Sequence, residues 1–92
     1  MTKRELLKRF DGLEKEKGVH IDGINQNSNK ASIQEAINCL CCSDEMLEKY
    51  LTVVSLKYPA IGKTISENGD FKKHGHNRKY VYDTARSILN AY

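Results

Sequence analysis

The chain has 92 residues, of which 39% are hydrophobic and 29% charged, and its formal net charge is +3. This size predicts one small domain, residues 1–92, because a chain of roughly 100 residues usually buries a single core. No stretch approaches the roughly 20 apolar residues that span a bilayer, and no apolar run of signal-peptide length follows the N-terminal basic residues. We therefore expect a cytoplasmic protein with no membrane partner.

The cysteines agree with this expectation. Cys39, Cys41 and Cys42 are odd in number and crowded together. A small secreted domain would instead carry an even set of cysteines, spread along the chain as a disulfide framework. The pattern favours a reducing compartment.

Charge is unevenly distributed along the sequence. Residues 31–50 hold one basic side chain against four acidic ones, whereas residues 51–92 hold seven basic against three acidic. A total of +3 is too small to indicate nucleic-acid binding by itself, so the clustering of the basic residues is what matters.

The first predicted element is a helix over about residues 3–17. Thr2 and Glu5 have the spacing of a capping box, in which each side chain accepts a hydrogen bond from the other residue's backbone. Gly18 can end the helix in a left-handed conformation. Residues 19–21 alternate as a short extended piece, and residues 22–30 are typical of a turn and polar loop. The helix is expected to bury the apolar residues at helical spacing, Leu6, Leu7, Phe10 and Leu13.

Two further helical patterns follow, over residues 32–42 and 43–57. Ser32 and Glu35 form a second capping box, and Ser43 followed by two acidic residues indicates another helix start. The apolar stripe is nearly continuous through Cys42 and Ser43, so one bent helix and two separate helices both remain open.

Pro59 predicts a break after residue 57 and the start of a short fourth helix, which Asn68 and Gly69 close. Residues 71–82, the basic cluster, then contain four basic residues, two histidines and three aromatic residues, with no acid. Residues 74–77 have turn chemistry and residues 78–82 are β-prone, which predicts a small basic β-hairpin. Asp83 is expected to cap a last helix that carries Ala85, Ile88, Leu89 and Tyr92.

The predicted fold class is therefore mainly α, with a minor β component. It is a small single-domain bundle of four to five helices with one short basic β-hairpin. We divide it into an N-terminal helix and polar loop, residues 1–31, and a helical core that includes the hairpin, residues 32–92.

Several fragments resemble chemical motifs but are incomplete. Residues 62–64 match the end of a phosphate-binding loop, but Lys57 stands where that motif needs a glycine. A cysteine nucleophile with His20 or His76 as base lacks a third, orienting residue. A tetrahedral zinc site is conceivable, but buried helix cysteines and surface histidines explain its residues better, so we expect no metal or cofactor and no enzyme activity. The four zinc candidates are Cys39, Cys42, His74 and His76.

The order of elements over residues 50–92 resembles the helix-turn-helix plus wing of excisionases and related small winged-helix regulators. In those families the stretch often opens with Tyr-Leu-Thr, here residues 50–52, and closes with a basic, aromatic wing before a short helix, here residues 78–80. The resemblance implies a winged-helix-like C-terminal half and binding to DNA.

Two functions are compatible with these patterns. The first is a small non-enzymatic regulatory protein that binds nucleic acid, preferably duplex DNA, through the short fourth helix and the basic hairpin. The second is a protein-interaction module, such as an inhibitor or adaptor, that docks to an acidic partner with Tyr80, Tyr82 and Tyr92 as anchors. The lysine-, asparagine- and isoleucine-rich composition also suits a phage or mobile-element accessory protein. The candidate binding residues are Lys63, Lys72, Lys73, His74, His76, Arg78, Lys79, Tyr80 and Tyr82.

Overall fold

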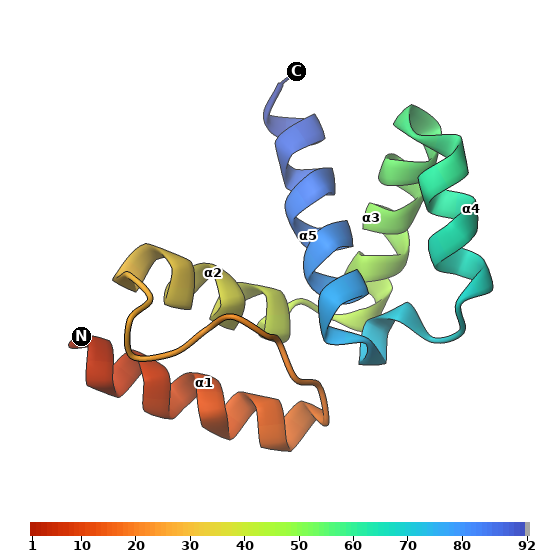
Figure 1. Cartoon of the computed structure of the whole chain (residues 1–92). Coiled ribbons are helices and arrows are strands. Elements are labelled where there is room, and N and C mark those ends of the chain that lie inside the picture. The colour runs from red at the N-terminus through yellow and green to blue at the C-terminus, as the bar shows by residue number, and fades with distance from the viewer. Residues whose placement is uncertain (92) are drawn as a thin grey trace. The chain divides into compact units, whose positions relative to one another are not determined.

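The computed structural model describes residues 1–91, which are mainly helical and contain no strand (Figure 1). The mainly α fold class is thereby confirmed. The chain divides into two compact units, Met1–Cys42 and a second unit that begins at Ser43. The helices are α1 (Lys3–Lys17), α2 (Lys30–Cys41), α3 (Asp44–Lys57), α4 (Pro59–Glu67), the short 3-10 helix η1 (Phe71–Lys73) and α5 (Gly75–Asn90).

Helix α1 begins and ends as the sequence predicts. The Glu5 amide donates to Thr2 Oγ1 at 3.2 Å, and the Thr2 amide donates to Glu5 Oε1 at 3.2 Å, which completes the capping box. Gly18 has φ of 68°, and its amide donates to the Glu14 carbonyl. A left-handed residue is therefore what ends the helix, and glycine adopts this conformation at little cost.

Helix α2 packs against α1 and completes the first unit (Figure 1). It begins two residues before the predicted capping box, because Asn29 is its N-cap and accepts a hydrogen bond from the Ser32 amide at 2.8 Å. The two units meet between residues 42 and 43. The single domain over residues 1–92, with its division after residue 31, stays a prediction. The core of this unit consists of Leu6, Phe10, Val19, Ile21, Ile33, Ala36, Ile37, Cys39 and Leu40.

Helices α2 and α3 are separate, which answers the question that the apolar stripe leaves open. Cys42 is extended, with φ of −65° and ψ of 131°. Ser43 then caps α3 by accepting a hydrogen bond from the Met46 amide at 3.1 Å, as the sequence predicts. Two acidic residues in the first turn favour the positive end of the helix dipole.

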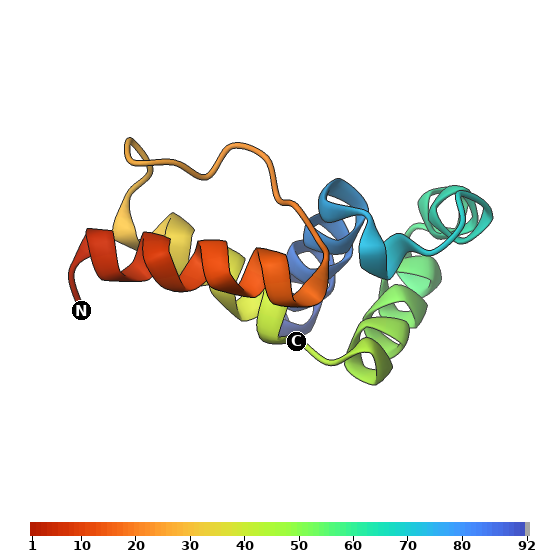
Figure 2. The ribbon, with the colours of Figure 1, turned by 90° about the horizontal axis from the view of Figure 1, so that it is seen from below.

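In the second unit α3 packs against both α4 and α5 (Figures 1 and 2). Tyr58 alone links α3 to α4, and Pro59 occupies the first turn of α4, as predicted. Gly69, with φ of 88°, follows the end of α4. The core of this unit consists of Leu47, Leu51, Val54, Ile65, Phe71, Val81, Tyr82, Ala85 and Ile88.

The predicted β-hairpin over residues 71–82 is wrong. These residues form η1 and the first half of α5, which runs on through Asp83, so Asp83 is not a helix cap. The buried positions Arg78, Val81, Tyr82 and Ala85 recur at helical spacing. The sequence pattern does not show this period if Arg78 is taken as a polar surface residue. The prediction then depends on the β-propensity of residues 80–82, which varies strongly with context. These residues therefore make no wing.

Candidate functional site

Lys72, a residue of the basic cluster, is paired with acidic side chains of its own unit. Its Nζ donates to Glu48 Oε1 at 2.8 Å and lies 4.0 Å from Asp70 Oδ1. The hydrogen bond to Glu48, reinforced by nearby acidic charge, raises the pKa of Lys72 above its ordinary value of 10.5. A phosphate would have to compete with these carboxylates for the ammonium group.

Arg78 is buried and has a structural role. Its side chain is only 3% exposed, and its Nη1 donates to the Lys72 carbonyl at 3.0 Å and lies 3.5 Å from Asp44 Oδ1. The guanidinium group thereby ties α5 to η1 and to the first turn of α3. A ligand in solvent has little access to it.

The other predicted cations differ in their surroundings. Lys79 Nζ lies 2.5 Å from Asp83 Oδ2, one turn further along α5. Lys63 is exposed on α4, and Lys73, His74 and His76 are exposed around the start of α5. Three of the four cations predicted to neutralise phosphates, Lys72, Arg78 and Lys79, are therefore paired with carboxylates of their own unit.

The predicted tyrosine anchors also differ. Tyr82 is 5% exposed, its ring lies edge-on to Tyr50 with 6.0 Å between centroids, and its hydroxyl accepts a hydrogen bond from Arg86. Tyr80 is 37% exposed. Tyr92 lies outside the described residues. Tyr80 can therefore contact a partner, whereas Tyr82 belongs to the core.

Tyr80 lines a groove between α4 and α5, which we call the α4–α5 groove. It consists of two hollows of about 490 and 350 Å³ that share Ile61 and Tyr80. The larger hollow is lined by Lys57, Tyr58, Ile61, Tyr80, Asp83, Thr84, Ser87, Ile88 and Ala91. The smaller is lined by Ala60, Ile61, Thr64, Ile65, His76, Asn77 and Tyr80.

The smaller hollow is lined mainly by apolar atoms, and the larger hollow by polar and apolar atoms in closer balance. Tyr58 is 40% exposed and Ile61 37%, although both are large and hydrophobic. Two lining residues carry a formal charge: Asp83, which is paired with Lys79, and Lys57, whose Nζ lies 5.8 Å from the centre of the Tyr58 ring. An apolar ligand with complementary negative charge would fit this lining.

The sequence-based prediction did not include the part that α4 plays in this groove. Ile65 of α4 is buried, whereas Ile61 of α4 and Tyr58, which precedes the helix, stay 37% and 40% exposed. Exposed apolar side chains next to one another are a signal for a contact surface. The spacing of Lys79 and Asp83, four residues apart, likewise indicates an ion pair on a helix.

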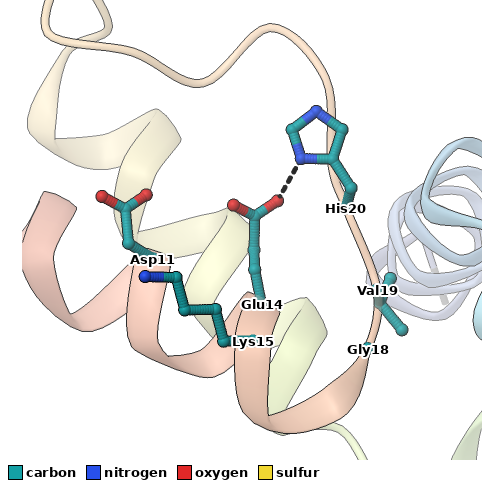
Figure 3. A pocket seen from close by; sticks show the side chains of 6 residues that line it. All are labelled: Asp11, Glu14, Lys15, Gly18, Val19 and His20. Carbon is teal, nitrogen blue, oxygen red and sulfur yellow. Dashed lines mark ion pairs between the residues drawn. The ribbon is translucent and has the colours of Figure 1, made fainter.

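The first unit contains a separate hollow of about 360 Å³ at the end of α1 (Figure 3). Glu14 Oε2 lies 2.8 Å from His20 Nδ1 and accepts a hydrogen bond from the Ile21 amide at 2.8 Å. His20 Nε2 lies 2.8 Å from Asp22 Oδ1. These contacts hold residues 20–22 to the end of α1, so a structural role accounts for His20.

The residues considered for zinc are not gathered into a site. Cys39 is buried within α2 and Cys42 follows that helix, whereas His74 and His76 belong to the second unit. Within residues 1–91 no group of three or more histidine, cysteine, aspartate and glutamate side chains is placed to hold a metal ion.

Over the same residues, every helix is too short or too polar to cross a membrane.

No family model, curated protein or solved structure matches this chain. A functional proposal therefore depends on the geometry and chemistry of the described residues.

Proposed function

We propose that this chain is a non-enzymatic protein-interaction module that binds its partner in the α4–α5 groove. The observation that carries the proposal is the exposure of Tyr58, Ile61 and Tyr80, each more than one third accessible, along one groove. Contiguous apolar surface on a small protein is costly in water and is typical of a binding site. Aromatic side chains are also enriched among the residues that dominate binding energy.

Nucleic-acid binding, the first function predicted from the sequence, stays a prediction. It depends on cations that can neutralise phosphates and release counterions. Because Lys72, Arg78 and Lys79 contact carboxylates, each would have to exchange an existing partner for a phosphate. The apolar lining of the groove supports a protein partner more directly than a phosphate backbone.

Photo-crosslinking tests the proposal in the cell from which the protein comes. A benzoylphenylalanine placed at Ser87, which is exposed and lines the groove, should capture a protein. The same group at Leu89, which is exposed on α5, lines neither hollow and lies about 200° around the helix from Ser87, serves as the matched control and should not capture that protein.

The captured protein is then purified and its affinity measured. Ser87→Gln, which places a longer side chain in the groove, should weaken binding about tenfold, equal to about 1.4 kcal/mol. Leu89→Gln, on the other side of α5, should leave the affinity within about twofold. Equal capture from both positions, or equal weakening by both substitutions, would contradict the proposal. Salt-dependent binding of duplex DNA that Lys73→Ala weakens and Ser87→Gln does not would favour nucleic acid instead.

A further inference from the structure

We infer that the α4–α5 groove takes an amphipathic α-helix of a partner protein that carries an acidic residue at the end near Lys57. This inference rests on the proposed function and names the kind of partner. It draws on three observations: the walls of the groove, its length and division, and the charges that line it.

The walls favour a helical occupant over an extended one. Both α4 and α5 use their backbone groups within the helices, and residues 1–91 contain no strand whose edge could pair with a peptide. An extended peptide laid along the groove would bury amides and carbonyls without partners, which is costly. A helix satisfies its own backbone and presents only side chains, as in other helix-in-groove complexes.

The length of the groove sets the length of the occupant. Its lining extends from His76 near the start of α5 to Ala91, the C-cap of that helix, which corresponds to about 22 Å at a rise of about 1.5 Å per residue. This is about four turns of a partner helix. Ile61 and Tyr80 are common to both hollows, so one apolar anchor can enter on each side of them.

The spacing of the two anchors follows from the positions of the hollows along α5. The lining that α5 and its C-cap give the smaller hollow lies within residues 76–80, and that of the larger hollow within residues 80–91, so the midpoints lie roughly 11 Å apart along the helix. On a partner helix this distance separates residues about two turns apart, at i and i+7 or i+8.

The charges in the lining indicate an acidic occupant. Asp83 is neutralised by Lys79 at 2.5 Å. Lys57 has no acidic partner within residues 1–91 and lies over the Tyr58 ring at the wall of the larger hollow. A carboxylate on the occupant would therefore gain a cation without displacing an existing ion pair. A basic occupant would leave Lys57 facing a like charge.

The test uses a displayed library of 18-residue helical peptides, randomised on one face and selected against the full 92-residue chain. Enriched peptides should carry apolar residues seven or eight positions apart and an aspartate or glutamate near one end. The best peptide, made synthetically, should lose about tenfold in affinity for Lys57→Glu. Lys63→Glu, at an exposed α4 lysine outside the groove lining, is the matched control and should change affinity less than about twofold.

A charge exchange makes the test specific for the carboxylate. A peptide in which the selected acid is replaced by lysine should bind Lys57→Glu better than it binds the wild type. Ser87→Gln and Ala60→Gln, at exposed positions on opposite walls, should each weaken the original peptide. Circular dichroism of every variant confirms that its helix content is unchanged.

The outcomes separate this inference from the proposed function. Selected peptides that bind in the groove but carry no enriched acid, or whose apolar residues alternate as in an extended chain, would overturn the inference of an acidic helix. The proposal that the groove binds a protein would then stand. Enriched peptides that bind Ser87→Gln and Ala60→Gln as tightly as the wild type would overturn both the inference and the proposed function. If the chain dimerises and either glutamine variant abolishes the dimer, a second copy is the occupant and the inference is overturned. Displacement of the peptide by duplex DNA would overturn it as well.

Discussion

Gly62 of α4 faces Ser55 of α3 so closely that a Cβ at position 62 would lie 2.0 Å from Ser55 Oγ and 2.8 Å from the Ser55 Cα. The sequence around Gly62 resembles part of a phosphate-binding loop, but the glycine serves the packing of two helices. This contact positions α4, and with it one wall of the α4–α5 groove.

Gly62→Ala should therefore destabilise the protein, although alanine is the better helix former. The added methyl group must push backbone atoms apart, and overpacking of this kind costs about 1–3 kcal/mol, against a propensity gain of about 1 kcal/mol. Gly12→Ala is the matched control, because nothing lies within 4 Å of a Cβ in that position of α1. It should stabilise the protein by about 0.5–1 kcal/mol. Urea denaturation of both variants measures the difference, and a stabilised Gly62→Ala would contradict the close approach.

Arg78→Ala should destabilise the folded protein, because Arg78 is buried and links α5 to Lys72 and Asp44. Loss of a hydrogen bond from a charged group and of buried packing should cost about 2–3 kcal/mol. Lys79→Ala removes a more exposed ion pair within one helix and should cost only about 0.5 kcal/mol. Equal melting temperatures for the two variants would show that Arg78 is not the structural residue described.

The basic cluster shows what local sequence patterns could and could not predict. The capping residues Thr2 and Ser43, the break at Pro59 and the helix end at Gly18 act through neighbouring residues, so local patterns predicted them correctly. Arg78 belongs to the core through contacts with residues 44 and 72, and no local pattern contains that information. Because Arg78 is buried, it is not part of the expected charged surface and instead completes the helical spacing of the buried positions of α5.

The groove could be predicted only in part. Tyr80 was among the candidate residues, but its neighbours Tyr58 and Ile61 were not, because they come from a different part of the chain. Which apolar side chains of α4 stay exposed depends on how α4 and α5 pack on α3. Packing of this kind is a tertiary property that helical periodicity does not specify.

The pair of Lys72 and Glu48 should make stability depend on pH at the alkaline end. The hydrogen bond to Glu48 raises the pKa of Lys72 above 10.5, so the folded state holds this proton more tightly than the unfolded state. The stabilisation is fully present below about pH 10.5 and is lost as pH rises through the raised pKa.

Glu48→Gln isolates this effect from the titration of other groups. The difference in urea midpoint between the wild type and Glu48→Gln should be constant from about pH 8 to pH 10 and should shrink above pH 10.5. A difference that stays constant or grows above pH 10.5 would mean that Glu48 does not hold the Lys72 proton.

Cys39 should behave as a buried apolar residue. Cys39→Ala should cost on the order of 1 kcal/mol, because it empties a small volume in the core of the first unit. Cys41→Ala, two residues along and exposed, should change the free energy of unfolding by less than about 0.5 kcal/mol. A chelator should not change the melting temperature. Stoichiometric zinc that is lost together with the fold would contradict this prediction.

Methyl NMR of isoleucine-labelled protein tests the central claim, protein binding in the α4–α5 groove, most directly. Ile61, Ile65 and Ile88 line the groove, whereas Ile33 and Ile37 are buried in the first unit and report any change outside it. On titration with the purified protein that crosslinking identifies, the methyl signals of the three groove isoleucines should shift while those of Ile33 and Ile37 stay in place. Shifts at Ile33 and Ile37 with none at Ile61, Ile65 and Ile88 would contradict the account.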